Sequence, residues 1–253
     1  MKNSIAIITG ATGGLGIEFV SQLINDVDEI WAIARNEEKL VNLGDQFGTK
    51  IKGFSIDLTD PFNLEKIRNR LLQEDVQVAY LVNNAGTGRM SASIDFSDTE
   101  IINHVNVHNT SMAILCNICL KYMGKGSHII NIASQAAFQP NPYINLYASS
   151  KVFCYSYSRA LALELESMGI TVTVVCPGWI KTDLLQTERN GVKIAFPHLA
   201  EAKDVVFQAI KDAGKGKNIS VYSTYVRWQR FLSWLFPTKA VMKTWTRGIR
   251  KYI

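Results

Sequence analysis

The feature that most constrains this chain is the regular alternation of short apolar runs with longer segments of helical period. The apolar runs are rich in Ile, Val and Ala and are continuous in polarity, which is the pattern of strands covered by helices on both faces. The longest helices are expected near 98–123 and 145–168. This alternation predicts a doubly wound α/β fold on a seven-stranded parallel sheet. The expected strands are 4–8, 30–34, 51–56, 78–82, 128–132, 171–175 and 219–222.

Length and composition set the number of domains. A chain of 253 residues that is 47% apolar can bury the core of one such domain, and it is too short for two ordinary domains with a linker. We therefore expect one catalytic domain over 1–253, with a helical extension at 223–253. Neither a secretory leader nor a membrane-spanning run is evident, so a cytoplasmic location is expected.

A glycine-rich stretch, I-T-G-A-T-G-G-L-G at 8–16, follows the first predicted strand and opens a helical segment. Glycines at such a position permit a tight turn, let a pyrophosphate approach the backbone and let the helix pack on the strand. The stretch therefore predicts a dinucleotide site. Two registers fit it, Gly10, Gly14 and Gly16 or Gly10, Gly13 and Gly16, and the motifs further along the chain favour the first.

The end of the second predicted strand bears on the choice of dinucleotide. The acidic residue that commonly holds the ribose of NAD is missing there, and the strand ends in Arg35. A guanidinium can pair bidentately with a 2′-phosphate. We therefore expect NADP(H) in preference to NAD(H). Asp57, just after the third strand, is expected to accept a hydrogen bond from the adenine amino group.

Five polar motifs follow, each at or beside the carboxyl end of a predicted strand, where a doubly wound fold binds its ligands. A single Y-x-x-x-K is common by chance, so the ordered set carries the argument. The motifs are N-N-A-G at 83–86, V-N-V at 105–107, N-I-A-S at 131–134, Y-A-S-S-K at 147–151 and P-G-W-I-K-T at 177–182.

With these motifs the chain resembles the short-chain dehydrogenases/reductases in their compact, single-domain Rossmann-fold form, over residues 5–222. By that resemblance the catalytic residues are Asn106, Ser134, Tyr147 and Lys151. It also implies that N-N-A-G supports the central sheet and that Thr182 holds the nicotinamide carboxamide. The cofactor-binding residues expected in full are Gly10, Thr12, Gly14, Leu15, Gly16, Arg35, Asp57, Asn84, Ala85, Gly86, Tyr147, Lys151, Pro177, Gly178, Ile180 and Thr182.

The chemistry of carbonyl reduction agrees with these roles. The cofactor supplies a hydride, so the protein must supply a proton. Lys151 lies one helical turn from Tyr147, and its positive charge favours the tyrosinate that remains after proton transfer. Ser134 would hold the substrate carbonyl. Asn106 would bind a water that returns protons to Tyr147 through Lys151 and the ribose.

Aromatic and aliphatic residues near the motifs suggest the substrate. An apolar pocket predicts a lipophilic ketone or secondary alcohol, of steroid-like or long-chain 3-oxoacyl type, although each of these residues can equally belong to the core. The expected substrate residues are Ser134, Phe138, Tyr143, Tyr147, Trp179 and Leu184.

The cysteines and histidines do not predict a metal site. Cys116 and Cys119 have C-x-x-C spacing inside an apolar helical stretch without a second pair, so core packing is expected. His104 and His108 are four residues apart without a third ligand. His108 is expected as a lining or surface residue.

Beyond residue 222 the chain predicts two amphipathic helices. Their apolar stripe either packs over the substrate cleft or a partner subunit, or lies on an anionic membrane surface. No Asp or Glu occurs at 213–253, although Lys and Arg are frequent there. The stripe comprises Trp228, Phe231, Leu232, Leu235 and Phe236, then Val241, Met242, Trp245 and Ile249 after Pro237.

Together these features predict an NADP(H)-dependent oxidoreductase that interconverts a lipophilic ketone and its secondary alcohol. The alternatives are a 3-oxoacyl reductase of lipid metabolism and a regulator that binds NADPH without turnover, although a regulator would not need the complete catalytic set. A homodimer or homotetramer paired through the two long helices is expected from the resemblance. The net charge of +5 arises in the C-terminal extension, so no nucleic-acid partner is expected.

Overall fold

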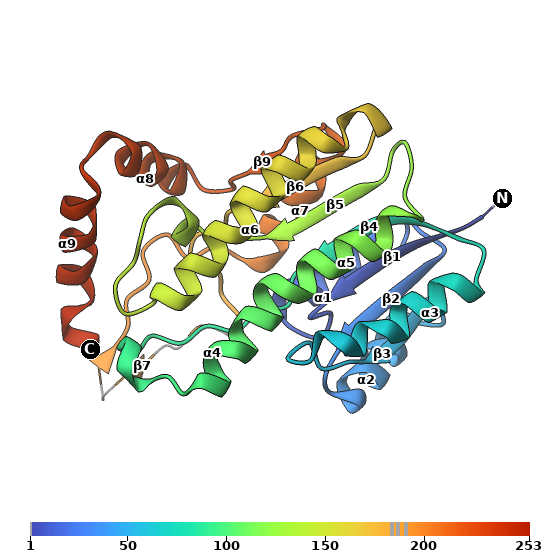
Figure 1. Ribbon diagram of the computed structural model, residues 1–253, viewed down its shortest axis with the longest axis horizontal. Helices are drawn as coiled ribbons and strands as arrows, with labels where there is room; N and C mark the ends of the chain where they lie inside the picture. The colour runs from blue at the N-terminus through green and yellow to red at the C-terminus, as the bar shows by residue number, and fades with distance from the viewer. Residues whose placement is uncertain (1, 183–184, 186–187, 190–191) are drawn as a thin grey trace.

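Seven parallel strands form the central sheet of the computed structural model, which describes residues 2–182, 185, 188–189 and 192–253 (Figure 1). Their order, β3-β2-β1-β4-β5-β6-β9, confirms the predicted doubly wound fold. The direction of winding reverses between β1 and β4, so the carboxyl ends of these two strands form the switch point. The strands are β1 (Asn3–Thr9), β2 (Glu29–Ala34), β3 (Ile51–Ser55), β4 (Val76–Asn83), β5 (His128–Ile132), β6 (Thr171–Val175) and β9 (Ile219–Ser220).

Helices cover both faces of the sheet. One face carries α1 (Gly14–Leu23), α2 (Glu37–Phe47) and α7 (Ala202–Gly214), and the other carries α3 (Glu65–Gln73), α5 (Ser111–Leu120) and α6 (Asn145–Glu164). Successive side chains of a strand point to opposite faces, so Ile5 and Ile7 enter one core and Ala6 and Ile8 the other. All four are fully buried, which explains why the strand had to be apolar without interruption.

The long helix predicted at 98–123 is interrupted by a π-helical turn. The segment consists of α4 (Asp98–Val105), a π turn at Asn106–Thr110 and α5, and the amide of Ser111 donates to the carbonyl of Asn106 five residues earlier. A π turn adds one residue without changing which residues are apolar, so the helical period did not reveal it. Such turns are frequent at functional sites.

The chain after β6 also contains a short antiparallel pair, β7 (Glu188–Arg189) and β8 (Val192–Lys193), in a segment without a clear sequence period. Both predicted C-terminal helices are present, as α8 (Thr224–Leu235) and α9 (Thr238–Ile249). Figure 1 shows them at one end of the molecule, away from the sheet. Among the described residues, no helix is both long and apolar enough to cross a bilayer.

Candidate active site

The first turns of α6 bring together two of the predicted catalytic residues, Tyr147 and Lys151. Lys151 is 6% exposed, and its Nζ donates to the carbonyl oxygen of Ile132 at the end of β5, at 2.8 Å. The same Nζ lies 5.5 Å from the centre of the Tyr147 ring. Half-buried Tyr147 therefore has a fixed positive charge beside it, at the carboxyl edge of the sheet.

Ser134 follows β5 directly and precedes a short 3₁₀ helix at Gln135–Phe138, which packs against α6. Its side chain is buried, and Oγ accepts a hydrogen bond from the amide of Ala136 at 3.2 Å. Because this bond uses the hydroxyl as an acceptor, its proton is still available for donation. Ser134 is thus held at a strand end with one donor to offer to a carbonyl oxygen.

Asn106 begins the π turn. Its Nδ2 donates to the carbonyl oxygen of Thr59 at 2.8 Å, which joins the π turn to the loop after β3. Asp57 lies in the same loop, and its Oδ1 accepts from the amide of Thr59 at 3.0 Å. Asn106 therefore has a structural partner that the sequence did not reveal, and its role in holding a water stays a prediction.

Three glycines of the turn after β1 have no room for a side chain. Gly10 has φ +63°, and a Cβ there would lie 3.0 Å from the Cα of Ala85. A Cβ on Gly14 would lie 2.6 Å from Cγ2 of Thr182, and one on Gly16 would overlap the carbonyl oxygen of Gly10. A Cβ on Gly13 would make an ordinary 3.5 Å contact. Sterically, Gly10, Gly14 and Gly16 are the constrained set, which is the register that the sequence favoured.

Thr9, the last residue of β1, joins this turn to the N-N-A-G loop. Its buried Oγ1 accepts from the amides of Asn84 and Ala85 at 2.9 and 3.0 Å. In return, Nδ2 of Asn84 donates to the carbonyl oxygens of Thr9 and Gly10 at 3.1 and 3.2 Å. The two loops at the switch point therefore form one cross-linked unit. Sequence reasoning missed Thr9; its only signal was a hydroxyl residue directly before the first glycine.

A buried chain of amides supports α6. Nδ2 of Asn83 donates to Oδ1 of Asn131 at 2.8 Å, and Nδ2 of Asn131 donates to Oγ of Ser158 at 2.9 Å. Ser158 in turn donates to the carbonyl oxygen of Cys154 at 2.7 Å. This chain crosses β4, β5 and α6, so it fixes the helix that carries Tyr147 against the sheet.

His104 and His108 are buried, and His108 is a lining residue of a small cavity, not a surface residue. Their rings stack with centroids 4.2 Å apart, and the rings of His108 and Tyr147 meet edge to face with centroids 5.8 Å apart. Nε2 of His108 lies 2.8 Å from both the amide nitrogen and the carbonyl oxygen of Thr87. A Cβ on Gly86 would lie 2.8 Å from Cε1 of His108, so glycine is required there. The π turn rotates this side chain under the N-N-A-G loop.

Burial keeps both imidazoles neutral. Desolvation, then the charge of Lys151, lowers the pKa of His104 to about 4. The same two causes, with His104 in addition, hold the pKa of His108 well below its ordinary value. The neutral pair therefore adds no positive charge beside Lys151 at neutral pH.

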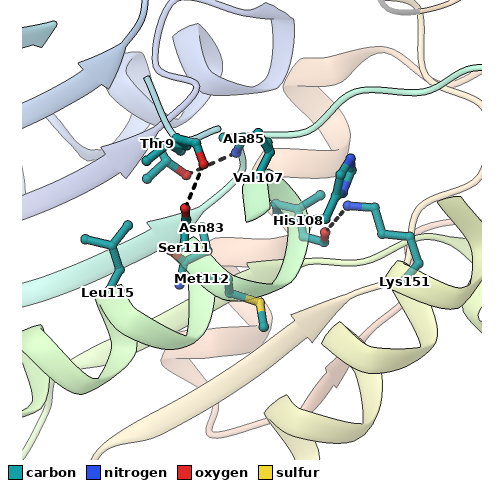
Figure 2. A pocket seen from close by; sticks show the side chains of 11 residues that line it. Thr9, Asn83, Ala85, Val107, His108, Ser111, Met112, Leu115 and Lys151 are labelled. Atoms are coloured by element: carbon teal, nitrogen blue, oxygen red, sulfur yellow. Dashed lines mark hydrogen bonds between the residues drawn. The ribbon is translucent and has the colours of Figure 1, made fainter. Parts of the chain in front are cut away.

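A cavity of about 10 Å³ lies between the switch point and Lys151. Figure 2 shows Lys151 reaching from its helix toward His108, with Thr9 and Ala85 on the opposite side. Asn83 and Ser111 also line this space. A cavity of this size holds about one water molecule. It is therefore too small to be the substrate site.

The expected determinants of nucleotide choice lie at the ends of β2 and β3. Arg35 is exposed and makes no ion pair with the described residues. Oγ of Ser55 donates to the backbone carbonyl oxygen of Arg35 at 3.2 Å, which holds the two strand ends together. The exposed side chain of Asp57 follows two residues later. An unpaired guanidinium at this edge fits an anionic ribose substituent.

The segment after β6 completes the predicted cofactor set. The carbonyl oxygen of Pro177 accepts from the amide of Gln135 at 2.8 Å, and Ile180 is buried. Gly178 lies against Val226 of α8, where a Cβ would approach to 3.0 Å. Thr12 and Leu15 lie half-buried in the glycine turn and the first turn of α1. Steric cradles at Gly10, Gly14 and Gly16 thus fit a dinucleotide, while individual contacts remain predictions.

The expected substrate residues fall into separate clusters. Phe138 packs edge-to-face with Tyr155 at 5.7 Å and lies under Arg230 of α8, so much of its surface serves packing. Trp179 pairs with Phe196 at 4.9 Å. Tyr143 has φ 66°, which is unusual for a tyrosine and marks a constrained loop. Leu184 lies outside the described residues.

All four cysteines are buried in the core. Burial raises the pKa of the Cys116 thiol to about 12, so this thiol is poorly suited to nucleophilic or redox chemistry. Within the described ranges no group of three or more His, Cys, Asp or Glu side chains is placed to bind a metal. The C-x-x-C pair thus lies in the apolar core, in agreement with the packing interpretation.

Comparisons with known proteins identify the family of this chain. The family model described as short chain dehydrogenase matches residues 4–193. The 3-oxoacyl-(acyl-carrier-protein) reductase FabG of Haemophilus influenzae is 31% identical over 229 residues, which cover 85% of this chain and 93% of that protein. Its counterpart in Escherichia coli is 30% identical over 202 residues, which cover 78% of this chain and 83% of that protein.

Solved structures share the fold at lower identity. A short-chain dehydrogenase from Sphingobium yanoikuyae in complex with NADPH superimposes with a TM-score of 0.76 at 23% identity, covering 95% of each chain. A short-chain dehydrogenase from Streptomyces avermitilis gives a TM-score of 0.79 at 20% identity, covering 100% of this chain and 99% of the other. Family match, sequence relatives and fold agree, and the chain therefore belongs to the short-chain dehydrogenases/reductases.

Proposed function

We propose that this protein is an NADP(H)-dependent oxidoreductase that interconverts a lipophilic ketone and its secondary alcohol. The observation that carries the proposal is the buried ammonium of Lys151, which lies beside the ring of Tyr147 and is fixed to the end of β5. Burying an ammonium group costs free energy unless the charge is paired and hydrogen-bonded. A tyrosinate that forms during proton transfer would be the negatively charged partner of Lys151.

The side chains divide the remaining work. A bound nicotinamide cofactor supplies the hydride. Tyr147 donates the proton to the carbonyl oxygen in reduction and takes it back in oxidation. The hydroxyl of Ser134 donates a hydrogen bond to the same oxygen, which orients the carbonyl. The neutral ring of His108 and the amide chain from Asn83 hold this arrangement in place.

NADP(H) is the favoured cofactor. The unpaired guanidinium of Arg35 at the end of β2 is suited to a 2′-phosphate, whereas the hydroxyl of NAD would leave it without a partner. Similar folds from Sphingobium yanoikuyae and Burkholderia cenocepacia are complexes with NADPH and NADP, although one from Burkholderia phymatum is a complex with NAD. Arg35→Asp should therefore raise KM for NADPH far more than KM for NADH. Equal changes would remove Arg35 from this role.

A 3-oxoacyl thioester is the second candidate substrate. The relatives from Haemophilus influenzae and Escherichia coli, at 31% and 30% identity, are 3-oxoacyl-(acyl-carrier-protein) reductases, and the matches cover most of this chain. Loss of NADPH absorbance should be followed with lipophilic ketones and with 3-oxoacyl thioesters of matched chain length. A higher kcat/KM for the thioester would favour this candidate over a simple ketone.

Tyr147→Phe is the control for both candidates, because it keeps the aromatic ring and removes the hydroxyl group that would donate the proton. Turnover should fall by about a hundredfold or more, while NADPH binding is retained. Full activity in this variant would refute the mechanism. If the unchanged protein binds NADPH but turns over no member of either panel, the regulator without turnover becomes the better interpretation.

Association through α4 and α6 is also proposed. Ile102 and Val105 of α4 and Val152 and Phe153 of α6 are exposed, and Phe153 stacks on Tyr157. Burying these apolar side chains against a second copy would give the expected homodimer or homotetramer. Light scattering after size exclusion would measure the mass, and Phe153→Glu should shift it to that of a monomer. A monomeric mass for the unchanged protein would refute the assembly.

A further inference from the structure

The C-terminal arm, defined here as residues 224–249 of α8, α9 and their junction, exposes a strip of apolar side chains. Trp234 is 79% exposed, Trp228 59% and Phe231 45%. Their rings are neighbours: the ring centroids lie 5.5 Å apart for Trp228 and Phe231 and 6.2 Å apart for Phe231 and Trp234. Leu235 and Phe236 extend the strip and are more than half exposed. A contiguous aromatic surface of this kind marks a binding face.

The charge of the arm is uniformly positive. Lys239, Lys243 and Arg247 of α9 are exposed and form no ion pair with the described residues. No acidic residue occurs anywhere in 213–253. Exposed tryptophans beside unpaired cations have the chemistry of an interfacial helix on anionic lipid: the rings enter the headgroup region and the cations meet phosphates.

The arm is anchored to the body by side chains other than those of the strip. Nε1 of Trp245 donates to the carbonyl oxygen of Pro142 at 2.9 Å. Ile249 and Tyr252 are buried, and the hydroxyl of Tyr252 accepts from the amide of Ala195. At the other end Val226 enters the core beside Cys176. These contacts hold the arm beside Pro142 and Ala195, and they leave the α8 strip free.

A second copy of the chain is a poor occupant for this face. A two-fold contact centred on the arm would place it against its own copy, because such interfaces use the same patch on both subunits. Both patches would then carry only positive charge, without an acidic side chain to offset the repulsion. An anionic lipid surface supplies both the apolar depth and the opposite charge.

We propose that the C-terminal arm is a peripheral lipid-binding surface. The aromatic side chains of α8 enter the headgroup region of an anionic bilayer, and the cations of α9 contact lipid phosphates. This property does not depend on the reaction catalysed. If the proposed function also holds, the loops beside the catalytic residues lie at the lipid surface, where a lipophilic ketone partitions.

Co-sedimentation with vesicles tests the proposal without cofactor or substrate, so its outcome is separate from that of the catalytic assay. Vesicles of phosphatidylcholine with phosphatidylglycerol should pellet the full chain at low salt, and pure phosphatidylcholine should pellet much less. High salt should weaken binding because it screens the cations. Lack of binding to the anionic vesicles at low salt would overturn the proposal.

Two variants and a matched control separate the contributions. Trp228→Ser combined with Trp234→Ser should lower the partition coefficient about tenfold or more, as should Lys239→Glu combined with Lys243→Glu. Phe62→Ser removes an aromatic side chain that is 84% exposed far from the arm, and it should bind as the unchanged protein does. Equal loss in the Phe62 variant, or a drop in oligomeric mass in the tryptophan variant without loss of vesicle binding, would overturn the proposal. Unchanged thermal unfolding shows that each variant is folded.

Discussion

Acid should destabilise this protein through the stacked imidazoles of His104 and His108. In the unfolded chain each ring takes up a proton near its ordinary pKa of 6.5, whereas burial lowers both pKa values in the fold. Below pH 6.5 the unfolded state therefore binds more protons than the folded state. Stability is fully present above that pH and falls as the pH falls toward the lowered folded values.

The size of the effect follows from the shift. With a pKa of 6.5 unfolded and about 4 folded, His104 loses about 2 kcal/mol of stabilisation between roughly pH 7.5 and pH 5. The pKa of His108 is lowered by the same causes, so this ring adds to the loss in the same direction. The loss of about 2 kcal/mol from His104 is by itself a sizeable part of the 5–15 kcal/mol, roughly, that stabilises a typical domain.

Urea denaturation at the two pH values measures this loss. Replacing both residues by Gln removes the titrating groups, so the variant should lose at least about 2 kcal/mol less than the unchanged protein. Any acid loss that remains belongs to other groups, including His128, whose pKa burial also lowers. His198→Gln is the matched control, because His198 is exposed, and it should keep the full acid loss. His104→Gln alone should remove about 2 kcal/mol of the acid loss. An unchanged acid loss in the double variant would refute the reasoning.

Three further substitutions test the switch point and the arm. Gly16→Ala places a Cβ against the carbonyl oxygen of Gly10, so the melting temperature should fall and NADPH fluorescence titration should show no binding; normal binding would contradict this steric requirement. Thr9→Val leaves the amides of Asn84 and Ala85 without their acceptor and should cost about 2 to 4 kcal/mol in urea denaturation, whereas Thr9→Ser should be nearly neutral. Trp245→Phe removes one hydrogen bond and should cost about 1 kcal/mol, measured in the same way; no change would mean that the bond does not anchor α9.

The sequence predicted the fold and the proximity of Tyr147 and Lys151 because both depend on short-range patterns. A strand buried on both faces must be apolar at successive positions, as Ile5 to Ile8 are, and this can be read directly along the chain. The four-residue spacing of Tyr147 and Lys151 is likewise one turn of a helix. Gly10 and Gly16 were recognisable because their constraints are partly local: Gly10 has a positive φ, and a Cβ on Gly16 would overlap the backbone of Gly10.

The tertiary structure decided how distant segments meet. Thr9 finds its partners about 75 residues further on, and the amide of Asn106 reaches Thr59, so neither contact leaves a local signal. The π turn buries His108 because one added residue changes the direction of its side chain while the apolar pattern stays the same. The amphipathic stripe of the arm was compatible both with packing on protein and with binding to a lipid surface. Only the fold showed that Trp245 is anchored while Trp234 is exposed, because burial depends on what the rest of the chain places nearby.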